Sequence, residues 1–135
     1  MRNGFADMGE AVDMRRDDLV YMGHNFAKIE LAENLSISLI HPTDGISRNF
    51  NNKIRDIIDR NAARRADLMF IGHYHKLAML KHQDVYGYVV PSFQRQTSFM
   101  ADNNLDSLVG GMIVTVNFNE LGNIASVATE IIELA

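Results

Sequence analysis

Between residues 35 and 75 the chain reads LSISLIHPTDGISRNFNNKIRDIIDRNAARRADLMFIGHYH. The stretch opens on a β-rich run at 35–40 and closes on a second apolar run at 67–71. Between the two runs, apolar residues recur at helical spacing. A strand, a helix and a strand in this order form the right-handed crossover that joins parallel neighbours in one sheet. We therefore expect an α/β fold with a partly parallel sheet.

The helix in this unit is amphipathic. One face carries charged residues, and the other carries the apolar residues Phe50, Ile54, Ile57, Ile58 and Ala62. Ser47 is a suitable N-cap residue, so we expect a helix of about four turns that starts there. Arg64 and Arg65 near its end suit the negative pole of the helix dipole.

Further strands are expected on both sides of this unit. Upstream, residues 19–22 and 26–31 are joined by Gly23-His24-Asn25, which is typical of a β-hairpin. Downstream, strands are predicted at 77–81, 86–90, 112–118 and 124–132, with a hairpin loop at 119–123. The second half should therefore be mostly antiparallel.

Length and composition limit the possible classes. A chain of 135 residues with 47% apolar and 22% charged residues fits one globular domain, which we place at 19–135 after a polar lead-in at 1–18. Thirteen Lys and Arg against 17 Asp and Glu give a net charge of −4, so any nucleic-acid contact must be local. Cysteine is absent, so a metal site must use histidine and carboxylates. With no apolar run near the ~20 residues of a membrane span, we expect a soluble, cytoplasmic protein without a membrane partner.

Histidines follow the two strands of the crossover unit. His41 comes directly after residue 40, and His73 comes two residues after residue 71. Ligands of open α/β sheets bind at the carboxyl ends of strands, so these two side chains should lie close together. On an extended backbone His75 would point to the same side as His73, about 6.5 Å away. An arbitrary His-x-His is more often an exposed polar loop, but a third histidine at a strand end favours a metal site.

The order of these motifs resembles a known family. Residues 70–76, Phe-Ile-Gly-His-Tyr-His-Lys, look like the Gly-His-x-His signature of calcineurin-like metallophosphoesterases, and Ile40-His41-Pro42 resembles that family's preceding histidine motif. The intervening helix and the later Val90-Pro91-Ser92-Phe93 extend the resemblance over roughly residues 19–132. Within the family, the motifs are most similar to those of the DNA-repair nucleases and phage phosphoesterases.

The resemblance implies the C-terminal half of a metallophosphoesterase-type β-sandwich flanked by helices. It also implies a dinuclear centre of Mn, Fe or Zn, in which His41 and His73 bind one metal and His75 the other. The implied activity is hydrolysis of phosphate mono- or diesters, with DNA among the candidate substrates. Such metals lower the pKa of bound water and neutralise charge on the phosphoryl oxygens, and imidazole suits them as a ligand.

The family's earlier motifs are absent from the sequence. Neither an Asp-x-His, a Gly-Asp-x-x-Asp nor a Gly-Asn-His followed by an acid occurs in these 135 residues. We therefore expect a missing N-terminal half or a complementing chain, and we expect the chain alone to be inactive. The alternative is a non-catalytic phosphoesterase-like scaffold, similar to the small subunits of replicative polymerases.

The remaining candidate residues have simpler interpretations. Asp67 lies six residues before His73 on one strand, roughly 20 Å away, so it cannot supply a bridging carboxylate. Asp44 is closer, but stabilisation of a turn is favoured over a metal role. His24 and His82 are expected in surface turns. Arg60, Arg64 and Arg65 could form a nucleic-acid patch, although charge compensation at a helix end explains them without a partner.

Overall fold

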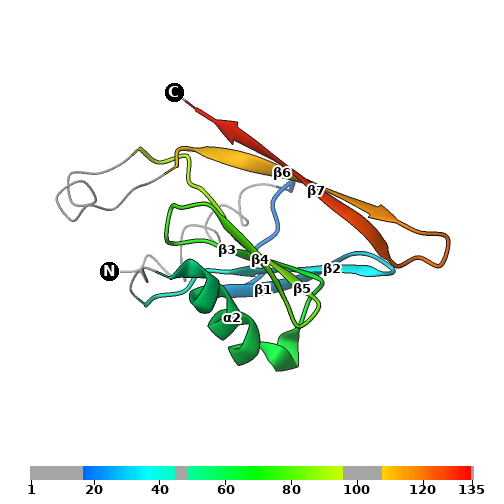
Figure 1. Ribbon diagram of the computed structural model, residues 1–135. Coiled ribbons are helices and arrows are strands. Elements are labelled where there is room, and N and C mark those ends of the chain that lie inside the picture. The colour runs from blue at the N-terminus through cyan, green and yellow to red at the C-terminus, as the bar shows by residue number, and fades with distance from the viewer. Residues whose placement is uncertain (1–16, 45–48, 96–107, 135) are drawn as a thin grey trace.

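The computed structural model describes residues 17–44, 49–95 and 108–134. Most of the predicted lead-in and the predicted cap Ser47 lie outside these residues. The described elements are, in chain order, β1 (Phe26–Ala32), β2 (Leu35–Ile40), α2 (Phe50–Arg60), a 3-10 turn (Ala62–Arg64), β3 (Leu68–Ile71), β4 (Ala78–His82), β5 (Val85–Val89), β6 (Gly110–Phe118) and β7 (Ile124–Glu133) (Figure 1).

Five strands form one mixed sheet in the order β1-β2-β3-β5-β4. β2 and β3 are parallel, with Ile37 opposite Leu68 and Ile40 opposite Ile71. β3 is also parallel to β5, whereas β1 and β4 pair antiparallel with their neighbours at the two edges. The predicted α/β fold with a partly parallel sheet and a strand-helix-strand crossover is confirmed.

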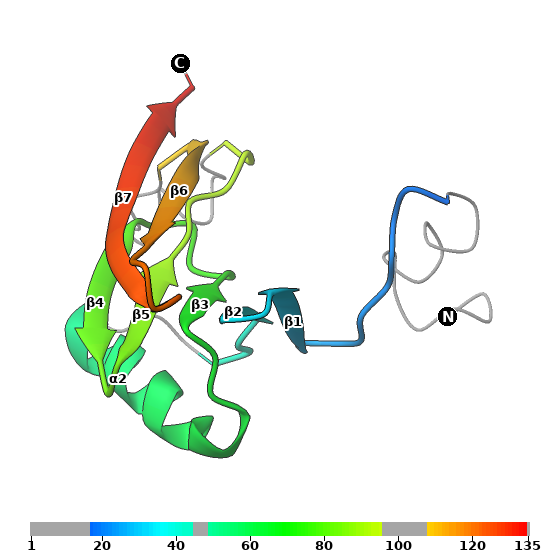
Figure 2. The same cartoon turned by 90° about the vertical axis from the view of Figure 1, so that its right-hand side faces the viewer.

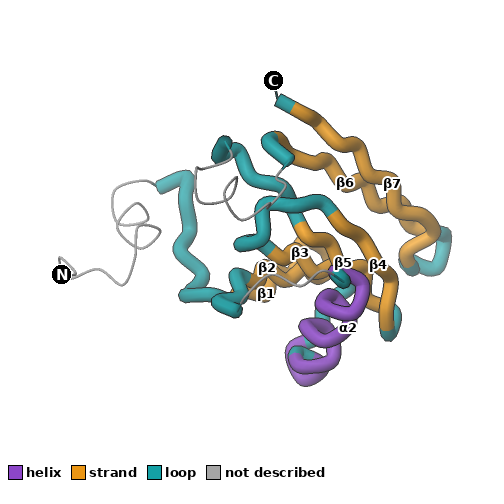
Figure 3. The backbone as a smooth tube through the Cα atoms, turned by 60° about the vertical axis from the view of Figure 1, so that its left-hand side comes forward, coloured by secondary structure: helices purple, strands orange, loops and turns teal. Residues whose placement is uncertain are grey.

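The sheet lies between two covering layers. Helix α2 packs on one face of the sheet, and the antiparallel pair β6-β7 lies over the other (Figures 2 and 3). Tyr88 of β5 is fully buried beneath β6-β7, where its ring stacks on Phe70 and its hydroxyl lies 3.3 Å from Thr129 Oγ1 of β7. Alternate residues of β3 and β5 therefore face the helix and the second sheet, as the two-residue period of a strand requires.

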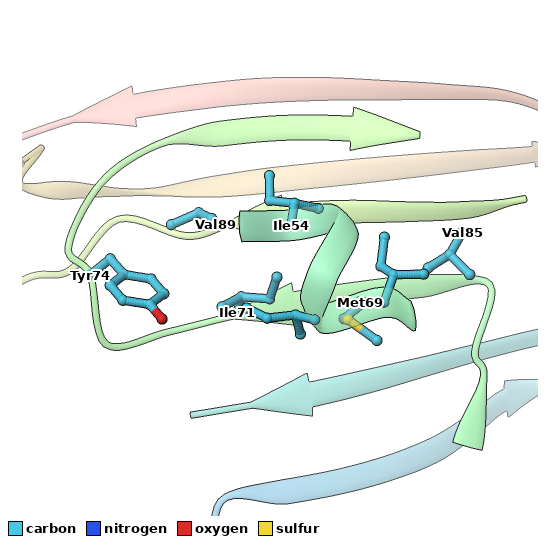
Figure 4. Packing of buried hydrophobic residues seen from close by; sticks show 8 residues of the cluster. Ile54, Met69, Ile71, Tyr74, Val85 and Val89 are labelled. Atoms are coloured by element: carbon cyan, nitrogen blue, oxygen red, sulfur yellow. The ribbon is translucent and has the colours of Figure 1, made fainter. Parts of the chain in front are cut away.

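The main core lies between α2 and the sheet. Ile54, Ile57 and Ile58 of the helix pack with Met69, Ile71, Tyr74, Val85 and Val89 (Figure 4). A Cβ on Gly87 would lie 2.6 Å from Ile54 Cγ2, so glycine allows the helix to approach β5 this closely. The apolar spacing thus predicted Ile54, Ile57 and Ile58 correctly, whereas Ala62 lies in the 3-10 turn after α2 and is exposed.

Two predicted elements differ in the structure. Residues 19–22 form no strand, and β1 pairs instead with β2 across a turn at Glu33 and Asn34. Helix α2 begins at Phe50, with Asn49 as its N-cap, and has 11 residues rather than four full turns. The Asn49 side chain accepts a hydrogen bond from Asn52 N at 3.2 Å, which Ser47 could not do for a helix starting at Phe50.

No helix among the described residues has the length and the apolar composition that a membrane span needs.

Candidate metal centre

His41 and His73 lie together at the carboxyl ends of β2 and β3. Gly72 N donates a hydrogen bond to Ile40 O at 2.9 Å, which continues the parallel pairing just past both strands. The two imidazole rings then meet edge to face, with centroids 5.0 Å apart. Both side chains are exposed, so an ion from solution can reach them.

His75 does not follow the extended geometry that the sequence suggested. β3 ends at Ile71, and His73 and His75 both have positive φ, 83° and 55°. The alternation of an extended strand therefore does not apply, and the reason given for a shared direction is wrong. His75 O accepts a hydrogen bond from Leu108 N at 3.1 Å, and its Nδ1 is buried without a hydrogen-bond partner among the described residues.

A partly buried hydrogen bond joins the segment that follows His41 to the segment that contains His73. Tyr74, between His73 and His75, is 1% exposed and donates its hydroxyl proton to Asp44 Oδ1 at 2.8 Å. Asp44 lies three residues after His41, so this bond ties the segment after β2 to the segment after β3. Figure 4 shows the Tyr74 ring at the end of the core next to Ile71 and Val89. No local sequence pattern indicates this role for Tyr74, because its partner Asp44 lies 30 residues away along the chain.

The charge of Asp44 is balanced by helix α2. Its carboxylate forms an ion pair with the Lys53 ammonium group, and Arg60 Nη2 lies 3.9 Å from it. The bonds from Lys53 and Tyr74 lower the pKa of Asp44 to about 2. Burial and the bond to Asp44 raise the pKa of Tyr74 well above its usual range. Asp44 therefore ties the segment after β2 to helix α2 and to Tyr74, which agrees with the expectation that it stabilises a turn or the approach to the helix.

Asp67 and His82 lie apart from the pair, whereas His24 lines a pocket together with His41. Asp67 accepts hydrogen bonds from Ser36 N and Oγ at 2.8 and 3.2 Å, at the far end of the sheet. His82 Nε2 lies 2.9 Å from Asp59 Oδ1. His24 is exposed in the segment before β1.

His41 and His73 could together contribute two ligands to one metal ion. Neutral imidazole is a suitable ligand for Zn, Fe and Mn, and His41 and His73 present two such rings. Within residues 17–44, 49–95 and 108–134, no group of three or more His, Cys, Asp or Glu side chains is arranged to hold a metal. A metal ion bound at this pair would therefore need further ligands from outside the described residues.

Comparisons with known proteins support the fold. No protein-family model and no curated protein matches the sequence. Among solved structures, the chain is similar to Vps29 from Entamoeba histolytica, crystallised in complex with Zn²⁺, with a TM-score of 0.53 and 16% sequence identity over 96% of this chain and 77% of that one. This chain therefore shares the overall fold of that structure. At this identity the likeness concerns the fold and not the activity.

Proposed function

We propose that this chain carries the histidine ligands of a metal-dependent phosphoesterase that hydrolyses phosphate mono- or diesters. The observation that carries the proposal is the pair of exposed imidazoles, His41 and His73, with centroids 5.0 Å apart at the ends of two parallel strands. Parallel strand ends are where open α/β sheets bind ligands. The motifs also favour the branch of DNA-repair nucleases and phage phosphoesterases, with DNA as one candidate substrate.

The metal would supply Lewis-acid activation of water and neutralisation of phosphoryl charge. In this chain His41 and His73 would hold one ion, of Mn, Fe or Zn, and His75 would serve a second. The buried, unpartnered Nδ1 of His75 supports a ligand role for that ring, since a buried imidazole nitrogen without a partner is costly. The Zn²⁺ bound by the structurally similar Vps29 supports metal binding by this fold.

The proposal includes a complementing polypeptide, either an N-terminal half or another chain, that supplies carboxylates. An apolar depression of about 680 Å³ borders His41 and Gly72. Its other lining residues are mostly apolar and include Leu19, Met22, Phe26, Leu39 and Phe70. A polypeptide packed in this depression would lie directly beside the histidine pair, where the missing ligands are needed.

Metal titration tests the proposal. We expect Zn²⁺ or Co²⁺ to bind the chain with one-to-one stoichiometry in isothermal titration calorimetry. His41→Ala or His73→Ala should each weaken binding by more than about tenfold, because loss of a direct ligand costs at least as much as loss of a supporting residue. His82→Ala is the matched control, because His82 is paired with Asp59 away from the site. Equal affinity of the wild type and both site variants would reject the proposal.

A second candidate function is a phosphoesterase-like scaffold without catalysis. It is favoured by the lack of a third ligand beside His41 and His73 among the described residues. The two functions differ in one measurement. A scaffold would keep its partner after His41→Ala and His73→Ala substitution and would show no metal-dependent hydrolysis with that partner bound.

A further inference from the structure

A second pocket, here called the arginine pocket, lies next to the histidine pair on the helix side of the sheet. It has a volume of about 450 Å³ and is bounded by the segment before β1, the segment after β2 and the C-terminal end of α2. His41 belongs both to its wall and to the histidine pair. The basic side chains among its lining residues are His24, His41, Arg60 and Arg64.

The charge of this pocket is opposite to that of the whole protein. None of the described residues that line it is an Asp or a Glu, although the chain has a net charge of −4. Arg60 and Arg64 carry permanent charges, because a guanidinium group does not lose its proton in proteins. A local cluster of this kind concentrates anions against the overall field of the molecule.

Arg64 is held in place without a carboxylate. Its guanidinium carbon lies 3.7 Å from the centre of the Phe26 ring, and its Nη2 donates to Asn61 Oδ1 at 2.6 Å. Asn61 is fixed in turn, because its Nδ2 donates to Ile57 O at 2.7 Å. An ordinary helix-end arginine that only compensates the dipole needs no such support. The arrangement presents an oriented guanidinium that forms no ion pair with a carboxylate of the described residues.

Arg60 differs from Arg64 in having an acidic neighbour. Its Nη2 lies 3.9 Å from Asp44, beyond hydrogen-bond distance, and its side chain is 61% exposed. Asp44 is itself paired more closely with Lys53. Arg60 can therefore turn toward an anion in the pocket without leaving Asp44 unpaired.

From this geometry we infer that the arginine pocket binds the phosphate group of a small phosphate ester, of about the size of a mononucleotide. Guanidinium groups bind phosphate oxygens through paired hydrogen bonds, and two residues with this group line the pocket. The volume of the pocket suits a small ligand and not a nucleic-acid strand. Binding of the phosphate needs no metal. The further step, in which the bound ester reaches the metal at His41 and His73, rests on the proposed function.

The test is a titration of the full chain with inorganic phosphate, 5′-AMP and a ten-nucleotide oligothymidylate at constant ionic strength, with EDTA present. Binding is followed by amide chemical shifts. We expect phosphate and 5′-AMP to shift resonances of residues that line the pocket. Arg60→Gln and Arg64→Gln should each weaken 5′-AMP binding about tenfold or more, as expected for a lost charged hydrogen bond.

Controls separate this site from general electrostatic attraction. Arg55→Gln removes the same charge from an exposed position of α2 that does not line the pocket, and it should leave binding unchanged. Arg64→Lys keeps the charge but loses the planar donor pair, so it should bind more weakly than the wild type. Thermal unfolding of each variant shows whether the fold is retained, and Arg60→Gln tests the site without touching the Phe26 contact.

Three results would overturn the inference. The first is no binding of phosphate or 5′-AMP at millimolar concentration. The second is equal weakening by Arg55→Gln and Arg60→Gln. The third is tighter binding of the oligonucleotide than of 5′-AMP, which would assign the arginines to a nucleic-acid surface. Because no metal is present in this assay, none of these outcomes decides whether His41 and His73 bind a metal.

Discussion

At the scale of single residues, the position of the histidine pair depends on Tyr74 and Asp44. His41 and His73 are exposed and follow the ends of short strands, so few packing contacts fix their side chains on the solvent side. The Tyr74 hydroxyl, at the edge of the core, donates a hydrogen bond to Asp44. Asp44 in turn forms an ion pair with Lys53 of helix α2. The two histidine segments are thereby joined to each other and to the helix.

We expect Tyr74→Phe to lower the free energy of unfolding by about 1 to 2 kcal/mol, because it removes one hydrogen bond to a charged group and leaves the ring packing intact. Zn²⁺ affinity should also fall, by about threefold to tenfold, because the two histidine segments are no longer tied together. Urea unfolding and calorimetry measure the two effects. Tyr86→Phe, on the other side of the sheet, is the control. Unchanged Zn²⁺ affinity in Tyr74→Phe would show that the bond has no positioning role.

Asp44 should make the free energy of unfolding depend on pH in the acidic range. Its pKa is lowered from 3.8 to about 2 in the folded protein, so its contribution is fully present above pH 3.8 and is lost as pH falls toward 2. The carboxylate is 42% exposed, so solvent screening keeps the contribution modest. We expect the stability difference between the wild type and Asp44→Asn to be constant above about pH 5 and to shrink below pH 4. Urea unfolding across pH 2–7 measures it, and a difference that does not vary with pH would contradict the assignment.

At the scale of secondary structure, the close contact between α2 and β5 leaves no room for a side chain at position 87. We expect Gly87→Ala to destabilise the protein by about 1 to 3 kcal/mol, because its new methyl group would lie 2.6 Å from Ile54 Cγ2. Gly111→Ala in β6 is the matched control, since its Cβ would meet only the ring of the exposed Phe93.

A double-mutant cycle tests this contact directly. Leucine lacks the methyl group on Cβ, so Ile54→Leu should recover part of the stability lost in Gly87→Ala. Urea unfolding of the two single variants and the double variant gives the coupling energy. Strict additivity would mean that the destabilisation comes from another source than this contact.

At the scale of the whole molecule, the proposed site would occupy one edge of the five-stranded sheet. The histidine pair lies between the apolar depression and the arginine pocket, and no described carboxylate completes it. We expect the chain alone, with Mn²⁺ added, to hydrolyse bis-p-nitrophenyl phosphate no faster than its His73→Ala variant. Two metal ions in a fixed array are needed to polarise a phosphodiester, and the described residues hold no ligand group for such an array. Clear turnover above the variant would show that the described and remaining residues suffice.

The amino-acid sequence determined the elements whose signals are local. Apolar spacing marked the buried face of α2, and the β-rich runs marked β2 and β3 and hence their parallel pairing. The placement of His41 beside His73 followed from that pairing, because parallel strands end at the same edge of a sheet.

Tertiary structure alone decided the features that depend on distant partners. β1 pairs with β2 and not with residues 19–22. The partner of a strand is set by which pairing lets it join the sheet and bury its apolar face, and a local turn signal does not contain that information. The φ angles of His73 and His75 leave the extended region, so the direction of His75 could not be derived from a two-residue period. The bond from Tyr74 to Asp44 and the support of Arg64 by Phe26 join residues 30 or more positions apart, and no local pattern encodes such contacts.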